Sequence, residues 1–214
     1  MSSHSTAATS RSGVDDDVDT VTPVGVDVGT RQLVAVATAD GTVDEAIVVD
    51  GDPARELYAE FTEATHQLQE GRTGDTLGDV VWRYWRWFRE LFRGAAEAVL
   101  EVASAHPAPV VVLEDLPGRR RPLVACRCGN LRAPTWFPAA VQAVVADRVV
   151  DAGVPVTYVD PEHTSKQCHR CDRFARDEGA TIVCQMPECS VDEVDRDRSA
   201  AVSIAKRASL EVDR

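Results

Sequence analysis

Four cysteines in two close pairs constrain the fold of this chain more than any other feature of its sequence. Cys168 and Cys171 form a C-x2-C pair, and Cys184 and Cys189 form a C-x4-C pair shortly afterwards. The intervening residues suit a short β-hairpin, which brings both pairs to one point. Four thiolates in such an arrangement are the usual ligands of a closed, structural Zn²⁺ site, so we predict a zinc ribbon over residues 163–194. Two disulfides or four unligated thiols are the alternative.

The setting of these cysteines favours metal binding over disulfides. The chain of 214 residues has no apolar export signal at its N-terminus and no apolar run long enough for a membrane span. We therefore expect a reducing, cytoplasmic location and no membrane partner. Cys126 and Cys128 form a C-x-C without a second pair, and we interpret them as reduced loop cysteines. A transient disulfide or a loose metal site is the alternative for these two.

The charge of the chain is acidic, and its basic residues are almost all arginines. The formal net charge is −12, and Lys166 and Lys206 are the only lysines. A carboxylate-rich surface with few lysines is typical of a halophilic protein, because it stays hydrated when salt screens its charges. Nucleic acid is therefore not excluded as a partner by the net charge.

The order of the apolar segments predicts a mixed sheet with helices. Residues 1–22 are rich in Ser, Thr and Asp and lack periodicity, which predicts a disordered tail. We expect strands over 24–29, 32–39, 42–49, 109–116 and 154–160, and helices over 52–70, 77–105, 136–153 and 197–210. This order predicts an α/β, ribonuclease H-like core formed by residues 23–162 and 195–214, with the zinc ribbon inserted near its end.

Two carboxylates stand out on the predicted strands. Asp27 is flanked on its own face of the strand by Gly25 and Gly29, which leave room for close approach of a backbone or ligand. Glu114 ends a strand with continuous apolar character. Since the two strands are neighbours in the predicted fold, these acids should face each other and need a cation or a shared proton. A cap or a surface charge is the alternative for each acid alone.

Helix geometry distinguishes Asp197 from its acidic neighbours. Apolar residues follow it at helical spacing as far as Ala208, so Asp197 should lie on the side that packs on the sheet. Three inward acids can hold two Mg²⁺ or Mn²⁺ ions for attack of water on a phosphodiester. The neighbouring acids are interpreted as surface or cap residues: Asp192, Glu193 and Asp195.

Four motifs in this order resemble those of the TnpB (OrfB) proteins of insertion sequences and of their relatives, the type V CRISPR nucleases. GVDVGTRQLVAVATADG resembles the first RuvC motif, VVVLEDL the second, VDPEHTSKQCHRC the start of the zinc ribbon, and DRDRSAAVSIA the third. The resemblance covers about residues 23–49 and 108–207. It implies a RuvC-like core in which Asp27, Glu114 and Asp197 are the catalytic, Mg²⁺- or Mn²⁺-binding acids. The zinc ligands that it implies are Cys168, Cys171, Cys184 and Cys189.

The function that this resemblance implies is a transposon-associated DNA endonuclease with a role in transposition and DNA recombination. It would act by two-metal-ion hydrolysis and bind DNA through the core and the zinc ribbon. The alternative is a non-catalytic nucleic-acid-binding remnant or regulator. Only residues 1–22 precede the first motif, so we expect the family's N-terminal region to be absent. A guide RNA or a separate chain that supplies that region is then a further expected partner.

Arginines gather on two segments that could contact nucleic acid. Arg83, Arg86, Arg89 and Arg93 share one arc of the helix predicted over 77–105. This arc either binds phosphates and bases or is the solvated face of a core helix. Three more arginines follow Glu114 and either grip a strand beside the metals or belong to a surface loop: Arg119, Arg120 and Arg121.

Overall fold

A computed structural model describes residues 21–116 and 133–212 of the chain, with side chains described over 137–208 in the second range. The tail predicted over residues 1–22 lies almost wholly outside the described residues. So do five residues that the sequence singles out: Arg119, Arg120, Arg121, Cys126 and Cys128.

Five strands form one mixed sheet in the order β3-β2-β1-β4-β5. The strands are β1 (Thr22–Val28), β2 (Gln32–Thr38), β3 (Ile47–Asp50), β4 (Pro109–Glu114) and β5 (Val156–Val159). β1 is antiparallel to β2 and parallel to β4, and β4 is parallel to β5. This mixed sheet confirms the predicted α/β, ribonuclease H-like arrangement, in which the first strand lies at the centre.

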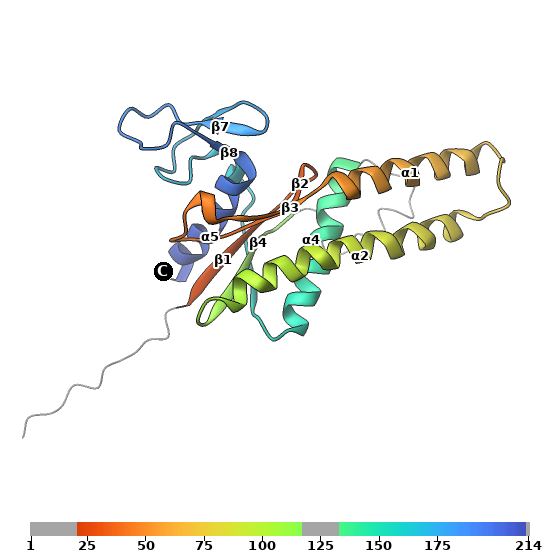
Figure 1. Ribbon diagram of the computed structural model, residues 1–214, viewed down its shortest axis with the longest axis horizontal. Helices are drawn as coiled ribbons and strands as arrows, with labels where there is room; N and C mark the ends of the chain where they lie inside the picture. The colour runs from red at the N-terminus through yellow and green to blue at the C-terminus, as the bar shows by residue number, and fades with distance from the viewer. Residues whose placement is uncertain (1–20, 117–132, 213–214) are drawn as a thin grey trace, which may run out of the picture.

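Helices cover both faces of the sheet. α1 (Asp52–Gln69), α2 (Leu77–Ser104) and α4 (Ala133–Asp151) lie on one side, and α5 (Arg196–Val212) lies on the other (Figure 1). α1 and α2 form a long antiparallel hairpin that extends away from the sheet. The core on the three-helix side is filled by aromatic rings from these helices, Phe61, Phe88, Phe92 and Phe137. The apolar side of α2 therefore packs inward, as its sequence pattern predicts.

The segment expected to form a strand over 42–49 begins instead as a 3-10 turn, η1 (Val43–Glu45). Thr42 and Glu45 form a capping box there, in which the backbone N–H of Thr42 donates to Glu45 Oε2 at 3.0 Å. The sequence T-x-x-E carries this capping signal, and it overrides the alternation of apolar residues on which the strand prediction rested. β3 consequently starts only at Ile47.

A second, three-stranded sheet lies apart from the main one, beside the start of α5 (Figure 1). Its strands are β6 (Arg176–Asp177), β7 (Thr181–Val183) and β8 (Glu193–Asp195). The antiparallel pair β6–β7 confirms the predicted hairpin between the cysteine pairs. The sequence did not predict β8, which pairs with β7 and leads directly into α5. Among the described helices, none is long and apolar enough to cross a membrane.

Candidate metal centres

Asp27 and Glu114 lie on the same face of the central sheet. Side chains alternate along a strand. Val24, Val26 and Val28 join the core under α1, α2 and α4, so Asp27 lies on the opposite face, towards α5. On β4, Val112 packs against residues of α5, and Glu114 shares its face because it is two residues further on. Gly25 pairs with Val112 across β1 and β4, and continuing this register places Asp27 opposite Glu114.

α5 adds Asp197 to this face of the sheet. Asp197 lies in the first turn of α5 and is only 4% exposed, as helix geometry predicts. One and two turns later, Ala201 and Ala205 press against Gly25. A Cβ atom on residue 25 would lie 2.1 Å from the Ala201 carbonyl oxygen and 2.5 Å from the Ala205 nitrogen. The missing side chain at position 25 therefore lets the helix approach β1 closely enough to bring Asp197 towards Asp27.

The electrostatics of Asp27 reflect this convergence. Burial raises the pKa of its carboxyl group well above the usual value, and the charges of Glu114 and Asp197 raise it further. Arg196 opposes the shift, and Asp195 adds to it. The pKa of Glu114 is also raised, chiefly by burial, although its hydrogen bond with Thr164 and the charge of Arg207 act in the other direction. The charges of Glu114 and Asp197 thus both act on Asp27, although among the described residues the four paired cysteines alone bring their ligand atoms within 4.8 Å of one another.

Two arginines partly neutralise Asp197. Arg31 Nη2 lies 2.9 Å from Asp197 Oδ2, and Arg196 Nε lies 3.1 Å from Asp197 Oδ1. The same Arg31 nitrogen also lies 2.9 Å from Asp195 Oδ2. Sequence analysis did not identify either arginine, although both are close in sequence to a predicted acid.

The structure confirms that Asp195 is a cap residue, one of the two roles expected for it. Its Oδ1 accepts hydrogen bonds from the backbone N–H groups of Asp197 and Arg198, so it does cap α5. Its other oxygen, however, binds Arg31, which also binds Asp197. If Asp195 were part of the helix, it would point away from Asp197, because the two residues are two positions apart. Asp195 is instead the last residue of β8, and α5 begins after it.

The donor set on this face fits a hard divalent cation. Carboxylate oxygens are the ligands that Mg²⁺ and Mn²⁺ prefer, and a cation would relieve the repulsion that raises the pKa of Asp27. Asp27, Glu114 and Asp197 come from three different elements, β1, β4 and α5. These three residues are the ones that would hold such an ion.

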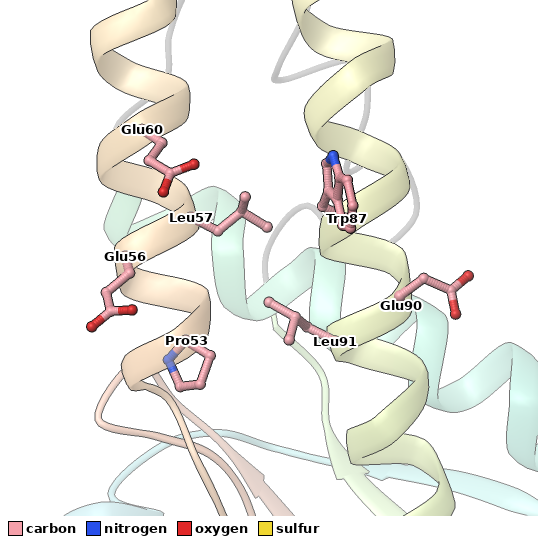
Figure 2. Close-up of a pocket in the computed structure, with 7 residues that line it drawn as sticks. All are labelled: Pro53, Glu56, Leu57, Glu60, Trp87, Glu90 and Leu91. Carbon is pink, nitrogen blue, oxygen red and sulfur yellow. The ribbon is translucent and has the colours of Figure 1, made fainter.

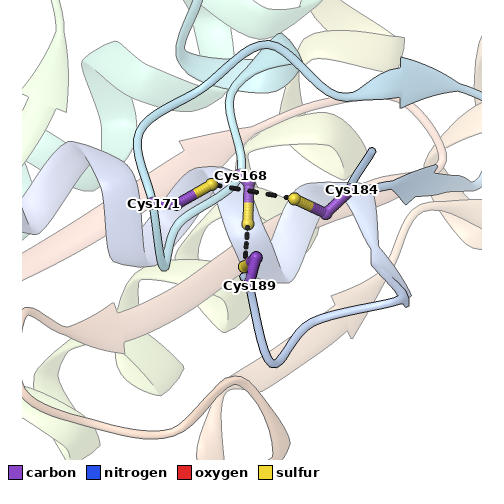
Figure 3. Close-up of side chains that lie close together, drawn as sticks. All are labelled: Cys168, Cys171, Cys184 and Cys189. Atoms are coloured by element: carbon purple, nitrogen blue, oxygen red, sulfur yellow. Dashed lines mark hydrogen bonds between the residues drawn. The ribbon is translucent and has the colours of Figure 1, made fainter. Parts of the chain in front are cut away.

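The four paired cysteines converge on one point, and their sulfur atoms face one another (Figure 3). All four sulfurs lie within 4.8 Å of one another, with 3.8 Å between Cys168 and Cys189 and 3.7 Å between Cys171 and Cys184. Sulfurs about 2.3 Å from a central zinc ion at the corners of a tetrahedron are about 3.8 Å apart. The cluster could therefore bind a zinc ion. Burial raises the pKa of the Cys168 thiol to about 12, so an ion must displace its proton.

The cysteine cluster is docked on α5 by the residue beside it. The backbone N and the Nδ1 of His169 lie 3.3 and 3.1 Å from Ser199 Oγ, and Lys206 Nζ donates to the His169 carbonyl oxygen. Burial lowers the pKa of His169, and Lys206 and Arg170 lower it further. His169 thus anchors the cysteine cluster to α5 at Ser199, two residues beyond Asp197.

The predicted arginine arc of α2 is exposed, but it is partly engaged in ion pairs. Arg83 Nη2 lies 2.8 Å from Asp75 Oδ2, and Arg93 Nη1 lies 3.5 Å from Glu90 Oε1. Arg86 and Arg89 make no ion pair with any residue that the structure describes. Within the described part of the chain, nothing therefore keeps these two arginines from meeting a phosphate.

A groove of about 380 Å³ lies between α1 and α2, but it is not suited to bind a phosphate (Figure 2). Its apolar residues include Leu57, Leu91 and Trp87, the last of which is 57% exposed. Three glutamates complete its lining: Glu56, Glu60 and Glu90. Their charges repel phosphates, so nucleic acid is not expected in this groove.

Comparison with known proteins finds a matching domain model and two similar structures, all described as Cas12f. The family model described as Cas12f1-like, TNB domain, matches residues 140–204, which include the four cysteines and Asp197. A cryo-EM structure of a Cas12f1–sgRNA–target DNA complex has a similar fold, with a TM-score of 0.65 and 16% identity over 91% of this chain. A CRISPR-Cas12f ternary complex gives a TM-score of 0.61 and 16% identity over 94%.

This chain spans about half of the first of those proteins and less of the second, 52% and 40% of their lengths. No curated protein matches the sequence significantly. At this identity the structural likeness establishes the fold alone, and the domain model matches residues 140–204. The chain therefore has a RuvC-like fold with a cysteine cluster that could bind zinc, and its residues 140–204 match the Cas12f1-like TNB domain.

Proposed function

We propose that this chain is the core of a TnpB-like DNA endonuclease that hydrolyses phosphodiesters with two divalent metal ions. The observation that carries the proposal is the convergence of Asp27, Glu114 and Asp197 on one face of the sheet, with the charges of the other two raising the pKa of Asp27. Buried carboxylates whose negative charges repel one another are expected at sites that bind a metal ion.

In the proposed mechanism, the three acids would hold Mg²⁺ or Mn²⁺ and would give up any shared proton to water. Such ions, when bound, would supply an activated water and neutralise the charge that develops on the phosphate. Arg31 and Arg196, whose side chains are 35% and 31% exposed, can move from Asp197 to the phosphate oxygens of the bound strand. Gly25 keeps α5 close to β1 and so fixes the distance between Asp27 and Asp197.

We assign the four cysteines a structural zinc ion. Four thiolates leave no open position for a substrate or water, so this ion takes no part in hydrolysis. It would hold the segment that leads into α5 in place, and the contact between His169 and Ser199 would fix that segment against the helix. The boundaries 163–194 for this zinc ribbon stay a prediction, as does a cytoplasmic location.

The proposed partners are DNA and either a guide RNA or a separate chain. The first similar structure is a complex with an sgRNA and target DNA, the second is a ternary complex, and this chain spans only 52% and 40% of their chains. Arg86 and Arg89 on α2 and the arginines at 119–121 are the proposed contacts with nucleic acid. Roles in transposition and recombination, and adaptation to high salt, are proposed on the resemblance and the composition.

Cleavage of a labelled single strand tests this proposal. The purified chain is incubated with Mn²⁺ or Mg²⁺ at high KCl, with and without a candidate guide RNA. Alanine at Asp27, Glu114 or Asp197 should reduce cleavage to background, and Asp192→Ala, which removes an exposed acid of the same segment, should not. No cleavage under any of these conditions would overturn the nuclease assignment for the chain.

A second candidate function is nucleic-acid binding without cleavage. The observation that favours it is the pairing of both Asp197 oxygens with arginine, since those cations already occupy part of the proposed metal site. Binding of DNA by the wild type without cleavage, unchanged in Asp197→Ala, would support this function instead.

A further inference from the structure

Glu114 is held at two points by side chains that sequence analysis did not assign to the site. Its Oε1 accepts a hydrogen bond from Thr164 Oγ1, and its backbone carbonyl accepts one from Gln142 Nε2 at 2.5 Å. Glu114, Thr164 and Gln142 are 8%, 2% and 1% exposed. Among the described residues, Oε2 of Glu114 takes no hydrogen bond. One oxygen of this buried carboxylate is therefore fixed, and the other is left for a cation.

The hydroxyl of Thr164 has a choice of acceptor. Besides Glu114, it faces the Pro161 carbonyl oxygen at 3.3 Å, but its single proton can serve one acceptor at a time. Ionised Glu114 is the stronger acceptor, because hydrogen bonds to a charged group are shorter and stronger than those to a neutral one. The contact with Glu114 is the closer of the two, in agreement with this expectation.

α5 holds the segment that carries Thr164. Thr164 begins the short helix η2 (Thr164–Lys166), directly after His163, whose φ of 69° turns the chain. Arg207 of α5 donates to the carbonyl oxygens of Asp160 and Glu162 at 2.6 and 2.7 Å, and to Gln167 Oε1 at 3.0 Å. The helix that supplies Asp197 thus also fixes the position of the hydroxyl that binds Glu114.

We propose that Thr164 is a positioning residue for the metal site, which fixes the Glu114 carboxylate so that its free oxygen can bind the ion shared with Asp27 and Asp197. The inference rests on the proposed metal-dependent function. A glutamate side chain has three rotatable bonds, and an unpaired one would lose its entropy only when the ion binds. Groups that orient metal ligands in this way typically contribute a factor of about 10–100 in metal affinity or activity.

Mn²⁺ binding tests the proposal independently of cleavage. Free Mn²⁺ is measured by electron paramagnetic resonance during titration of the full, zinc-loaded chain. Thr164→Val keeps the shape of the side chain and removes the hydroxyl, and Thr164→Ser keeps the hydroxyl. We expect Thr164→Val to weaken Mn²⁺ binding by about 10–100-fold. Thr164→Ser, which keeps the hydroxyl, should bind Mn²⁺ as the wild type does.

Thr181→Val is the matched control. Thr181 Oγ1 donates to Glu193 Oε1 at 2.8 Å, which is the same kind of bond on the exposed sheet beside the cysteine cluster. This variant should bind Mn²⁺ as the wild type does. Zinc content and thermal unfolding are measured for every variant, and Thr164→Ala replaces Thr164→Val if the latter does not fold cooperatively.

The outcomes separate this inference from the proposed function. If the wild type and the variant without the hydroxyl bind Mn²⁺ with equal affinity, the proposed role of Thr164 is overturned, but the proposed function is not. Mn²⁺ binding that depends on Thr164, without DNA cleavage by the wild type, supports that role and contradicts the nuclease assignment. A wild-type chain that binds no Mn²⁺ overturns both.

Discussion

Gly25 of β1 lies so close to Ala201 of α5 that a Cβ atom at position 25 would come within 2.1 Å of the Ala201 carbonyl oxygen. Asp27 is two residues further along β1, about 7 Å away, and Asp197 is one turn earlier on α5, about 6 Å away. The contact between helix and strand therefore fixes the separation of two of the three acids.

Gly25→Ala should destabilise the protein strongly. The added methyl group meets backbone atoms on both Ala201 and Ala205, which cannot rotate away, so we expect a loss of at least about 1–3 kcal/mol in the free energy of unfolding. Denaturant unfolding measures this loss. The matched control is Gly94→Ala in α2, where no described atom beyond the adjacent residues and the helix's own nearby backbone lies within 4 Å of the new Cβ. This control should gain about 0.5–1 kcal/mol, and similar losses in both variants would contradict the close packing at Gly25.

Asp27→Asn should change how stability depends on pH. The folded-state pKa of Asp27 is raised above its usual value of 3.8, so the folded state binds this proton more tightly than the unfolded state. The stability that the protonated form supplies is complete below the usual pKa and is lost as the pH rises through the folded-state pKa. In EDTA, the melting temperature of the wild type should therefore fall relative to that of Asp27→Asn as the pH rises above about 4.

At neutral pH, Mg²⁺ should reverse the difference in melting temperature between the wild type and Asp27→Asn. An ion that binds only the folded state at a hundred times its dissociation constant stabilises that state by about 2.7 kcal/mol. The melting temperature of the wild type should rise with Mg²⁺ more than that of Asp27→Asn. Parallel shifts in the two proteins would argue against a metal ion at Asp27.

Arg31→Gln should lower the stability of the metal-free protein and increase the stabilisation that Mg²⁺ provides. Arg31 binds both Asp195 and Asp197 at 2.9 Å, so its removal leaves two acids with less positive charge nearby and removes a competitor for the ion. Calorimetry in EDTA and in Mg²⁺ measures both effects. The control is Arg148→Gln, which breaks a surface ion pair with Glu97 and should cost less than about 1 kcal/mol under both conditions.

Asp195→Ala should destabilise α5 even though this acid is not a proposed metal ligand. It removes a carboxylate that caps the helix through two backbone N–H groups, and loss of such a cap typically costs about 1 kcal/mol. Thermal unfolding detects this loss. Zinc content should be unchanged, and a variant as stable as the wild type would show that the cap contributes nothing.

Cys184→Ser should abolish tight zinc binding. Three thiolates and a hydroxyl form a much weaker site than four thiolates, and metal binding at such sites contributes directly to folding. Atomic emission should find about one zinc ion per chain in the wild type and much less in the variant. Ser190→Ala, in the exposed neighbourhood of the same cluster, is the control and should keep its zinc. Full zinc content in Cys184→Ser would contradict the proposed site.

The parts of the fold that follow apolar periodicity could be predicted from the sequence. The strand at Val24–Val28, the buried strand ending at Glu114 and the helix beginning near Asp197 all appear as expected. The capping box at Thr42 was the exception, because a short polar signal overrode an alternating pattern. The convergence of Asp27 and Glu114 could be predicted because the register of two neighbouring strands determines it.

The polar contacts around the acids could not be predicted in the same way. Thr164 meets Glu114, and Arg31 meets Asp195, across long stretches of sequence, and neither pairing follows from any periodicity. Gln142 did leave a signal, since it is a lone amide within the apolar segment AAVQAVVA, where a buried polar group needs a partner. Its partner, a carbonyl at the end of β4, is visible only in three dimensions.

The position of α5 at the centre of this network has a consequence for synthesis of the protein. Asp27 emerges from the ribosome well before Asp197 and Arg207, which follow the cysteine cluster in the sequence. Because β1 exposes Gly25 until α5 packs against it, an incomplete chain cannot assemble the three acids. Contacts between such distant residues also form slowly. A nascent or prematurely released chain would therefore carry no complete site, so any cutting activity would be withheld until the whole core has been made.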